Sequence, residues 1–357
     1  MIVLAVLLVA GIIAMINSIP LSIRTIYSYS REVLGVTPRG DPTQTERIVR
    51  EIKLRSPVPI ERVMICRATG TQVNSIVGNF PFIVLGLKAE DMQWYLERQR
   101  TRAVIGRLPE KGAPEAVISQ PVAKNLGLKL GDVLLGPELS ESYSPMEVKV
   151  VGIGLTERWY MLTSIEYQRQ HHFPPIDFAM VAARNLEDQS KLDRWAEERF
   201  KGERAQMWAF HQIERNSNEM FATLYQILNV VIGTLALVIT IMMGMLMNIY
   251  QSQRLVEFAL LQAIGYTRRQ LLSRVILESI AVVVLGWVLG VVAAYGLLNL
   301  AKKIMLDPKA YSLDPMDLGA YAYTIPVPLA ILVVALLTVA LRFRKFDPVG
   351  VVERRLV

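Results

Sequence analysis

The chain has 357 residues, of which 52% are apolar and 20% are charged, and its formal net charge is +7. This composition is too apolar for a disordered chain or for one that coats nucleic acid, so we expect no nucleic-acid partner. Four stretches contain no Asp, Glu, Lys or Arg, namely Met1–Ile23, Met220–Gln253, Ser279–Ala301 and Leu318–Leu341. Each exceeds the roughly 20 residues that a helix needs to cross a bilayer, which excludes a wholly soluble protein.

Basic residues predict the orientation of these four helices. The segments on the same side as the tail hold nine of them, namely Arg254, Arg268, Arg269, Arg274, Arg342, Arg344, Lys345, Arg354 and Arg355. The loop on the opposite side, Lys302–Asp317, holds three. Because cytoplasmic loops carry the excess of Lys and Arg, we expect the tail inside and the polar insert Arg24–Glu219 outside. A cleaved signal peptide at Met1–Ile23 is the weaker alternative, since that run has no basic start and no small-x-small cleavage site.

We therefore predict a membrane α-helical protein (four transmembrane helices) with a large mixed α/β extracytoplasmic domain inserted between helices 1 and 2. The expected segments are transmembrane helix 1 at 1–26, an extracytoplasmic (periplasmic) domain with stalk ends at 27–219, transmembrane helix 2 at 220–251, a cytoplasmic segment at 252–274, transmembrane helix 3 at 275–301, an extracytoplasmic loop at 302–317, transmembrane helix 4 at 318–341 and a cytoplasmic tail at 342–357.

Apolar periodicity predicts alternating short strands and helices in the insert. Strands are expected at Ile60–Cys66, Phe80–Gly86, Glu115–Ser119, Met146–Ile153 and Phe178–Ala183, and helices at Thr43–Arg55, Glu90–Arg100, Pro121–Asn125 and Leu186–Lys201. Helix 2 is expected to continue outward to Met207 as a stalk, because its charge-free run alone would span about 51 Å against a hydrocarbon core of about 30 Å. Thr25–Leu34 is expected to form a matching stalk above helix 1.

The chain carries no motif for catalysis or for a cofactor. It has no Gly-x-x-x-x-Gly-Lys-Ser/Thr run, no His-Glu-x-x-His and no Gly-x-Ser-x-Gly, so we expect no nucleotide site and no hydrolytic centre. His171, His172 and Asp177 combine metal-ligand types, but adjacent side chains point apart, and exposed loop residues are the simpler interpretation. The single cysteine, Cys66, is expected to be a small buried residue rather than a reactive thiol.

Two glycines, Gly286 and Gly290, stand four residues apart in the third apolar stretch. Small residues at this spacing let two membrane helices approach closely. We therefore predict that they form a helix-packing face.

The most informative segment is Ser252–Gly290, which starts with a short amphipathic stretch broken at Gly265. It resembles the segment before the third helix in the FtsX-like / MacB-type ABC transporter permease family, of the macrolide-exporter and lipoprotein-release type. The residues that match the family pattern are Arg254, Glu257, Ala259, Leu260, Ala263, Ile264, Gly265, Arg268, Arg269, Gln270, Glu278 and Gly286. Gln262 stands where the family usually has arginine, and Tyr266 stands where it has a small residue.

The resemblance extends over most of the chain. Gly106–Pro109, Glu115–Ser119 and Gly131-Asp132 are similar to the outer domain of the same family, and the tail from Asp347 to Arg354 is similar to its usual ending. One helix, a large outer domain and then three helices is also the order of elements in that family.

The resemblance implies a non-catalytic permease subunit in the bacterial inner (cytoplasmic) membrane that couples ATP hydrolysis to movement of its extracytoplasmic domain, a process called mechanotransmission. Its partners would be a separate ABC ATPase subunit that binds the ATP, a second permease copy in a homodimer or related heterodimer, membrane lipid, and in some relatives a periplasmic adaptor and an outer-membrane channel. The expected substrate is amphipathic: a lipid, peptide, drug or lipoprotein. The expected ATPase-coupling residues are Arg254, Glu257, Phe258, Leu261, Gln262, Ile264, Gly265, Tyr266, Arg268 and Arg269.

Two alternatives from other functional classes stay open. In the first, the protein transports nothing and regulates an extracytoplasmic enzyme such as a cell-wall hydrolase. In the second, it is a membrane sensor or scaffold without an ATPase. The identity of copurifying proteins would distinguish the three hypotheses.

Overall fold

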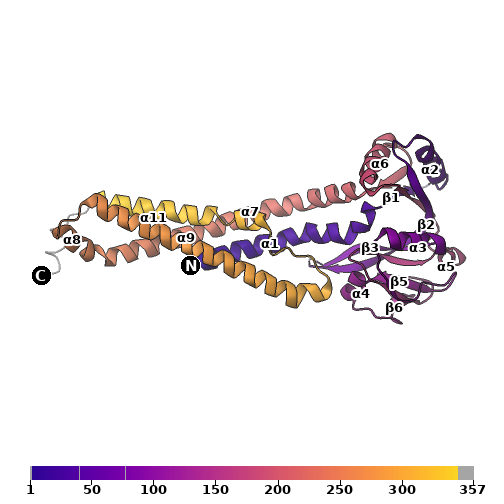
Figure 1. Cartoon of the computed structure of the whole chain (residues 1–357), viewed down its shortest axis with the longest axis horizontal. Helices are drawn as coiled ribbons and strands as arrows, with labels where there is room; N and C mark the ends of the chain where they lie inside the picture. Colours follow the sequence, from indigo (N-terminus) through magenta and orange to yellow (C-terminus); the bar gives the residue numbers. More distant parts are fainter. Residues whose placement is uncertain (1, 40, 77, 345–357) are drawn as a thin grey trace. The chain divides into compact units, whose positions relative to one another are not determined.

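A computed structural model of the chain describes residues 2–39, 41–76 and 78–344, and its elements are labelled in Figure 1. The chain divides into two compact units. The helical unit comprises Met1–Asn17, Ala222–Lys302 and Asp314–Val357, and the sheet unit comprises Ser18–Phe221 and Lys303–Leu313. The division falls inside two long helices, α1 (Ile2–Ile26) and α7 (Phe210–Gln253).

The helical unit contains the longest apolar helices. Besides parts of α1 and α7, its elements are α8 (Leu255–Ala263), α9 (Arg268–Ala301), α10 (Leu318–Ala322) and α11 (Pro326–Arg344). Four segments are long and apolar enough to cross a membrane, namely Ile2–Arg31, Tyr225–Leu246, Arg268–Lys309 and Leu318–Thr338. In the single chain, at least half of each apolar segment is not buried, as expected for surfaces that face lipid or other helices.

The last candidate span, Leu318–Thr338, corresponds to the helix predicted at 318–341, but it has a short break near its start. α10 ends at Ala322 and α11 begins at Pro326. Proline lacks a backbone donor and disfavours helical geometry in the residue before it, which makes Pro326 suited to a first helical turn and not to a helix interior. Thr324 lies in the break, where its hydroxyl donates to the carbonyl of Tyr321 at 2.6 Å and accepts from the Trp287 indole at 3.0 Å.

A mixed ten-stranded sheet forms the body of the sheet unit (Figure 1). Its strands are β1 (Leu34–Pro38), β2 (Ile60–Ser75), β3 (Gly78–Leu87), β4 (Val104–Gly106), β5 (Glu115–Ser119), β6 (Val133–Leu135), β7 (Val148–Gly154), β8 (Met161–Ser164), β9 (Phe178–Ala183) and β10 (Ala205–Trp208). They follow the order β10-β1-β9-β2-β3-β8-β5-β7-β4, and β6 pairs with β7. The pairs β3 with β8 and β5 with β7 are parallel.

Besides the outer ends of α1 and α7 and the segment Lys303–Leu313, this unit contains five α-helices and the 3-10 helix that follows α1. They are the 3-10 helix η1 (Tyr27–Arg31), α2 (Thr43–Arg55), α3 (Ala89–Arg98), α4 (Gln120–Leu126), α5 (Ile165–Gln170) and α6 (Leu186–Arg199). The alternation of β9 separates two cores: Ala179 and Val181 pack with residues of α2 and α6, whereas Met180 and Ala182 pack with residues of α3. Period-two alternation places successive side chains on opposite faces, and here both faces are covered.

Several sequence-based elements are confirmed at their bounds. The structure has the helix Thr43–Arg55 and the strands Glu115–Ser119 and Phe178–Ala183 as predicted. The predicted strand Ile60–Cys66 is too short, because β2 continues to Ser75 in a hairpin with β3.

Both stalk predictions need correction at their outer ends. α1 ends at Ile26 and continues as the 3-10 helix η1 to Arg31, and β1 begins at Leu34, so the predicted stalk Thr25–Leu34 is helical only as far as Arg31. Met207 does not extend the second long helix but lies in β10, where it pairs with Val36. The helix starts only at Phe210, after the strand has used the backbone groups of Ala205–Trp208 for pairing.

Candidate functional site

The segment that joins α7 to α9 contains the residues matched to the coupling motif. α8 ends in a turn at Gly265, which has φ +104, a value that side-chain-bearing residues rarely adopt. The amide of Gly265 donates to the carbonyl of Gln262 and that of Tyr266 donates to the carbonyl of Leu261, both at 3.1 Å. These two bonds form a Schellman motif, which satisfies carbonyls that a helix end otherwise leaves unpaired.

α9 begins with a capping box. The Thr267 hydroxyl accepts from the amide of Gln270 at 3.3 Å, and the Gln270 side chain accepts from the amide of Thr267 at 2.9 Å. Reciprocal caps of this kind fix the first turn of a helix. Gln270, which the sequence singled out only as part of the motif, therefore has a structural role at the start of α9.

Arg254 connects the ends of α7, α8 and α9. Its Nη1 donates to both carboxylate oxygens of Glu278 at 2.8 Å, and its Nε donates to Glu257 at 3.0 Å. The same Nη1 donates to the Tyr250 hydroxyl at 3.1 Å. These bonds, above all that to Glu278, raise the pKa of Arg254 and keep its charge fixed. Arg254 is thus a positioning residue for α8.

Phe258, one of the expected coupling residues, does not lie on an exposed surface of the single chain. Its side chain is only 4% exposed, and the Arg254 guanidinium carbon lies 5.5 Å from its ring centroid. It lines a small cavity of about 250 Å³ together with Met243, Val275 and Val282. Phe258 therefore anchors α8 against α7 and α9.

The exposed apolar side chains of the segment are Leu260, Ile264 and Tyr266, which are 58%, 74% and 44% exposed. Arg268 and Arg269 follow directly and are also exposed. Apolar side chains beside positive charge are typical of a protein contact surface. We call Leu260, Ile264 and Tyr266 the exposed α8 patch. Leu260 belongs to the matched motif but was not among the expected coupling residues.

The other expected coupling residues lie around this patch. Glu257 is exposed, while Leu261 and Gln262 are half-buried. The Gln262 side-chain oxygen is buried and has no hydrogen-bond partner among the residues that the structure describes. The segment thus separates into an anchoring set headed by Arg254 and Phe258, and an exposed set headed by Ile264.

The two glycines of α9 lie at a close approach between helices of the helical unit. A Cβ atom built on Gly286 would lie 3.2 Å from the Cβ of Ile2, and one built on Gly290 would lie 2.7 Å from the Cβ of Val6. The second distance is shorter than side chains tolerate, so a larger residue at Gly290 would force α1 away from α9.

Asp177, one of the residues considered for metal binding, is engaged by two arginines. Asp177 accepts from Arg67 and, at 2.6 Å, from Arg169. No cluster of three His, Cys, Asp or Glu side chains with the spacing of a metal site occurs among residues 2–39, 41–76 and 78–344. Cys66 is fully buried in β2, which confirms the expectation of a small buried residue, and this burial raises the pKa of its thiol well above the usual value.

Comparison with known proteins identifies the C-terminal part of the chain. Residues 229–348 match the family model "FtsX-like permease C-terminal", a range that includes α8, α9 and the exposed α8 patch. No curated protein sequence matches the chain.

Among solved structures, the chain is similar to the periplasmic region of MacB from Actinobacillus actinomycetemcomitans, with 10% identity over 54% of this chain and 94% of that one, at a TM-score of 0.31. It is also similar to the extracellular domain of the ABC-type transporter YknZ from Gram-positive bacteria, with 13% identity over 49% of this chain and 99% of that one, at a TM-score of 0.27. The resemblance seen in the sequence is confirmed over residues 229–348, which match the C-terminal part of FtsX-like permeases, and this match points to the permease component of an ABC-type transporter.

Proposed function

We propose that the chain is the permease subunit of an ABC transporter in the bacterial inner membrane, and that residues 252–274 dock on a separate ATPase subunit. The observation that carries this proposal is the exposed α8 patch, which lies inside the family match. Ile264 alone leaves 74% of its side chain exposed at the tip of a tight turn. Apolar residues in such positions gain stability when a partner covers them.

The anchoring residues support a mechanical role for the segment. Arg254 and Phe258 hold α8 against α7 and α9 through the ion pair with Glu278 and through apolar packing. A push on the exposed α8 patch is then passed to two long helices instead of being absorbed by a loose loop. We propose that α7 transmits this movement to the sheet unit, which would lie outside the membrane, and that ATP is bound by the partner subunit.

The same proposal includes a second permease copy. The apolar helices of the single chain remain largely exposed, and only 6% of the apolar segment within Tyr225–Leu246 is buried. Lipid and a second permease, identical or related, are the partners that such surfaces accept. A periplasmic adaptor and an outer-membrane channel would carry an amphipathic substrate, lipid, peptide or lipoprotein onward.

Copurification tests the docking proposal directly. We expect Ile264→Asp to remain in the membrane but to lose a copurifying ATP-hydrolysing subunit, because the substitution places a charge at the centre of the contact. Ile304→Asp is a matched control, since Ile304 is 64% exposed but belongs to the short helix Lys302–Leu306 that follows α9. Equal recovery of the ATPase with both variants would show that the exposed α8 patch is not the docking site.

A further inference from the structure

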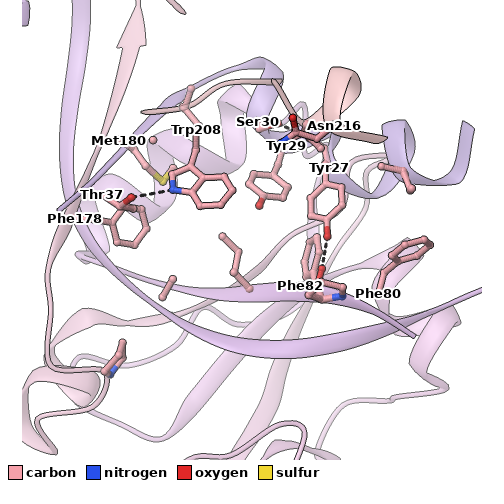
Figure 2. Close-up of a pocket in the computed structure, with 18 of the residues that line it drawn as sticks. Tyr27, Tyr29, Ser30, Thr37, Phe80, Phe82, Phe178, Met180, Trp208 and Asn216 are labelled. Atoms are coloured by element: carbon pink, nitrogen blue, oxygen red, sulfur yellow. Dashed lines mark hydrogen bonds between the residues drawn. The ribbon is translucent and has the colours of Figure 1, made fainter. Parts of the chain in front are cut away.

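A large apolar pocket lies in the sheet unit. Its volume is about 970 Å³, which is near the upper end of the range of about 300–1,000 Å³ for ligand pockets in proteins. Figure 2 shows Tyr27 and Tyr29 on one side, Phe80 and Phe82 opposite them, and Trp208 projecting between Phe178 and the tyrosines. No Asp, Glu, Lys, Arg or His occurs among the described residues that line it.

The polar atoms of the lining bond mainly to one another. The Trp208 indole donates to the Thr37 hydroxyl at 2.9 Å, and the Tyr27 hydroxyl donates to the carbonyl of Pro81 at 2.5 Å, as the dashed lines in Figure 2 mark. Tyr29, Asn79 and Asn216 contribute further polar side chains, but the wall is mostly carbon and its described residues carry no charge, which disfavours a charged occupant. Ser217 is only 6% exposed, and its buried hydroxyl has no hydrogen-bond partner within the described part of the chain.

The helices that line the pocket also contain candidate membrane spans. Ile23 belongs to the span Ile2–Arg31, and Ile213 and Ser217 lie on α7, which contains the span Tyr225–Leu246. Arg24 and Glu214, the next residues along each helix, form an ion pair at 2.8 Å that ties α1 to α7 beside the pocket. A ligand that reaches this pocket along α1 or α7 would come from a lipid phase.

We propose that the pocket binds the hydrocarbon chain of a membrane-derived, single-chain amphiphile whose polar head remains outside the uncharged lining. A peptide would bring unpaired backbone amides into a wall with few partners, and a cationic compound would find no counter-charge. An alkyl chain needs neither, and Ser217 offers one hydrogen bond to its first polar atom. This inference concerns the sheet unit alone, so ATPase docking and chain binding can fail independently.

Trp208 provides a direct readout, because its ring lines the pocket and is 44% exposed. The full chain in lipid nanodiscs is titrated with a long-chain fatty acid that carries bromine near its methyl end, since bromine quenches tryptophan fluorescence on contact. The wild-type signal minus that of Trp208→Phe isolates Trp208 from the other four tryptophans. We expect saturable quenching of this component. If the wild-type chain showed no saturable quenching of Trp208, the proposal would be overturned, whatever the variants of the pocket wall show.

Ala68 allows the pocket to be filled, because it lines the wall and is half-buried on β2. We expect Ala68→Phe to weaken the quenching affinity roughly tenfold, since the ring occupies space that the chain needs. Ala68→Ser keeps the volume and should bind as the wild type does, and so should Leu139→Phe, which adds a ring at an exposed site outside the lining. Equal affinities for Ala68→Phe and Ala68→Ser would overturn the proposal, as would tighter quenching by a brominated polycyclic aromatic that has no alkyl chain.

Discussion

Arg254 donates from one nitrogen, Nη1, to both carboxylate oxygens of Glu278 at 2.8 Å, so the N-cap residue of α8 is tied to a residue about one third of the way along α9. The two residues are 24 positions apart, and both match the coupling motif. Their side chains are 24% and 40% exposed, so the pair contributes modestly to stability, in the range of about 0–1 kcal/mol. Its importance lies in fixing the direction of α8.

The first prediction follows from this pair. We expect Glu278→Gln to leave expression nearly unchanged but to reduce the ATP turnover of the purified complex, because α8 then moves independently of α9. Tyr250→Phe removes a hydrogen bond to the same Arg254 nitrogen and should have little effect, since Arg254 keeps both of its bonds to Glu278. Unchanged ATP turnover in Glu278→Gln would contradict the positioning role.

Sequence patterns predicted the elements whose burial depends on their own periodicity. Thr43–Arg55 has one apolar side, formed by Ile48, Val49 and Ile52, and all three side chains are buried. Phe178–Ala183 is a continuous apolar run and forms a strand covered on both faces. In these cases the pattern specifies the element without knowledge of its neighbours.

The missed elements depend on distant partners. β10 has only four residues, and β1 contains Gly35 and ends at Pro38, so neither has a strong strand pattern. They form because they pair with one another across the chain, Gly35 with Trp208 and Val36 with Met207. Tertiary pairing of this kind cannot be read from a local sequence window.

The site was predicted as a segment but not as two sets of side chains. Apart from Glu257 and Gln262, α8 contains only apolar residues, with Phe258 buried and Leu260 exposed only two positions later. Because apolar residues occupy most sides of this helix, periodicity does not distinguish the side chain that anchors it from the one left for a partner. Only the positions of α7 and α9 decide this.

The second prediction concerns orientation in the membrane. Glu138 in the sheet unit and Arg269 at the start of α9 are both exposed. We expect a cysteine replacing Glu138 to react with an impermeant thiol reagent in intact cells, and one replacing Arg269 to react only after the membrane is opened. The native Cys66 is fully buried and gives a low background. The reverse labelling pattern would refute the proposed topology.

The pKa values of two carboxylates of α6 are shifted in opposite directions. Asp193 is 3% exposed, and burial raises its pKa to about 7, although a hydrogen bond from Gln189 at 2.8 Å and the charge of His211 oppose the increase. Burial also opposes ionisation of Glu197, but bonds from Gln212, His211 and Arg215 lower its pKa to about 2. Asp193 therefore changes its charge near pH 7 and Glu197 near pH 2, so the two residues affect stability in separate pH ranges.

The third prediction is a stability profile. Because its pKa is raised, Asp193 contributes stability that is fully present below pH 3.8, its ordinary pKa, and that is lost as the pH rises through about 7. The difference corresponds to at most about 4 kcal/mol of unfolding free energy. We expect the midpoint temperature of thermal unfolding of the full chain to decrease as the pH rises from about 5 to about 8. Asp193→Asn should make this decrease smaller.

Glu197→Gln serves as the matched control on the same helix. The depressed pKa of Glu197 stabilises the fold above its ordinary value of 4.5 and is lost only as the pH falls toward about 2. This variant should therefore lower the midpoint at both about pH 5 and about pH 8 and retain most of the wild-type decline, because the charge of Glu197 is the smallest of the effects on the pKa of Asp193. A decline that persists unchanged in Asp193→Asn would show that another group causes it.

The last prediction treats α7 as a path for force. α7 is a continuous helix of 44 residues, about 66 Å long, that begins in the sheet unit and ends beside α8. Glu219 is an exposed position within it, before the candidate span that starts at Tyr225. A proline there removes a backbone donor and breaks the helix at a cost of about 3 kcal/mol.

We expect Glu219→Pro to insert into the membrane, to bind the ATPase and to hydrolyse ATP, but to reproduce the phenotype that loss of the gene causes. Insertion and docking survive because they depend on Tyr225–Leu246 and on the exposed α8 patch, which the substitution does not touch. Glu219→Ala keeps the helix and should support full function, which separates loss of the carboxylate from loss of rigidity. If the proline variant retained full output while spectroscopic distances confirmed a kinked α7, force transmission along this helix would be wrong, and a pathway within the bilayer would explain transport better.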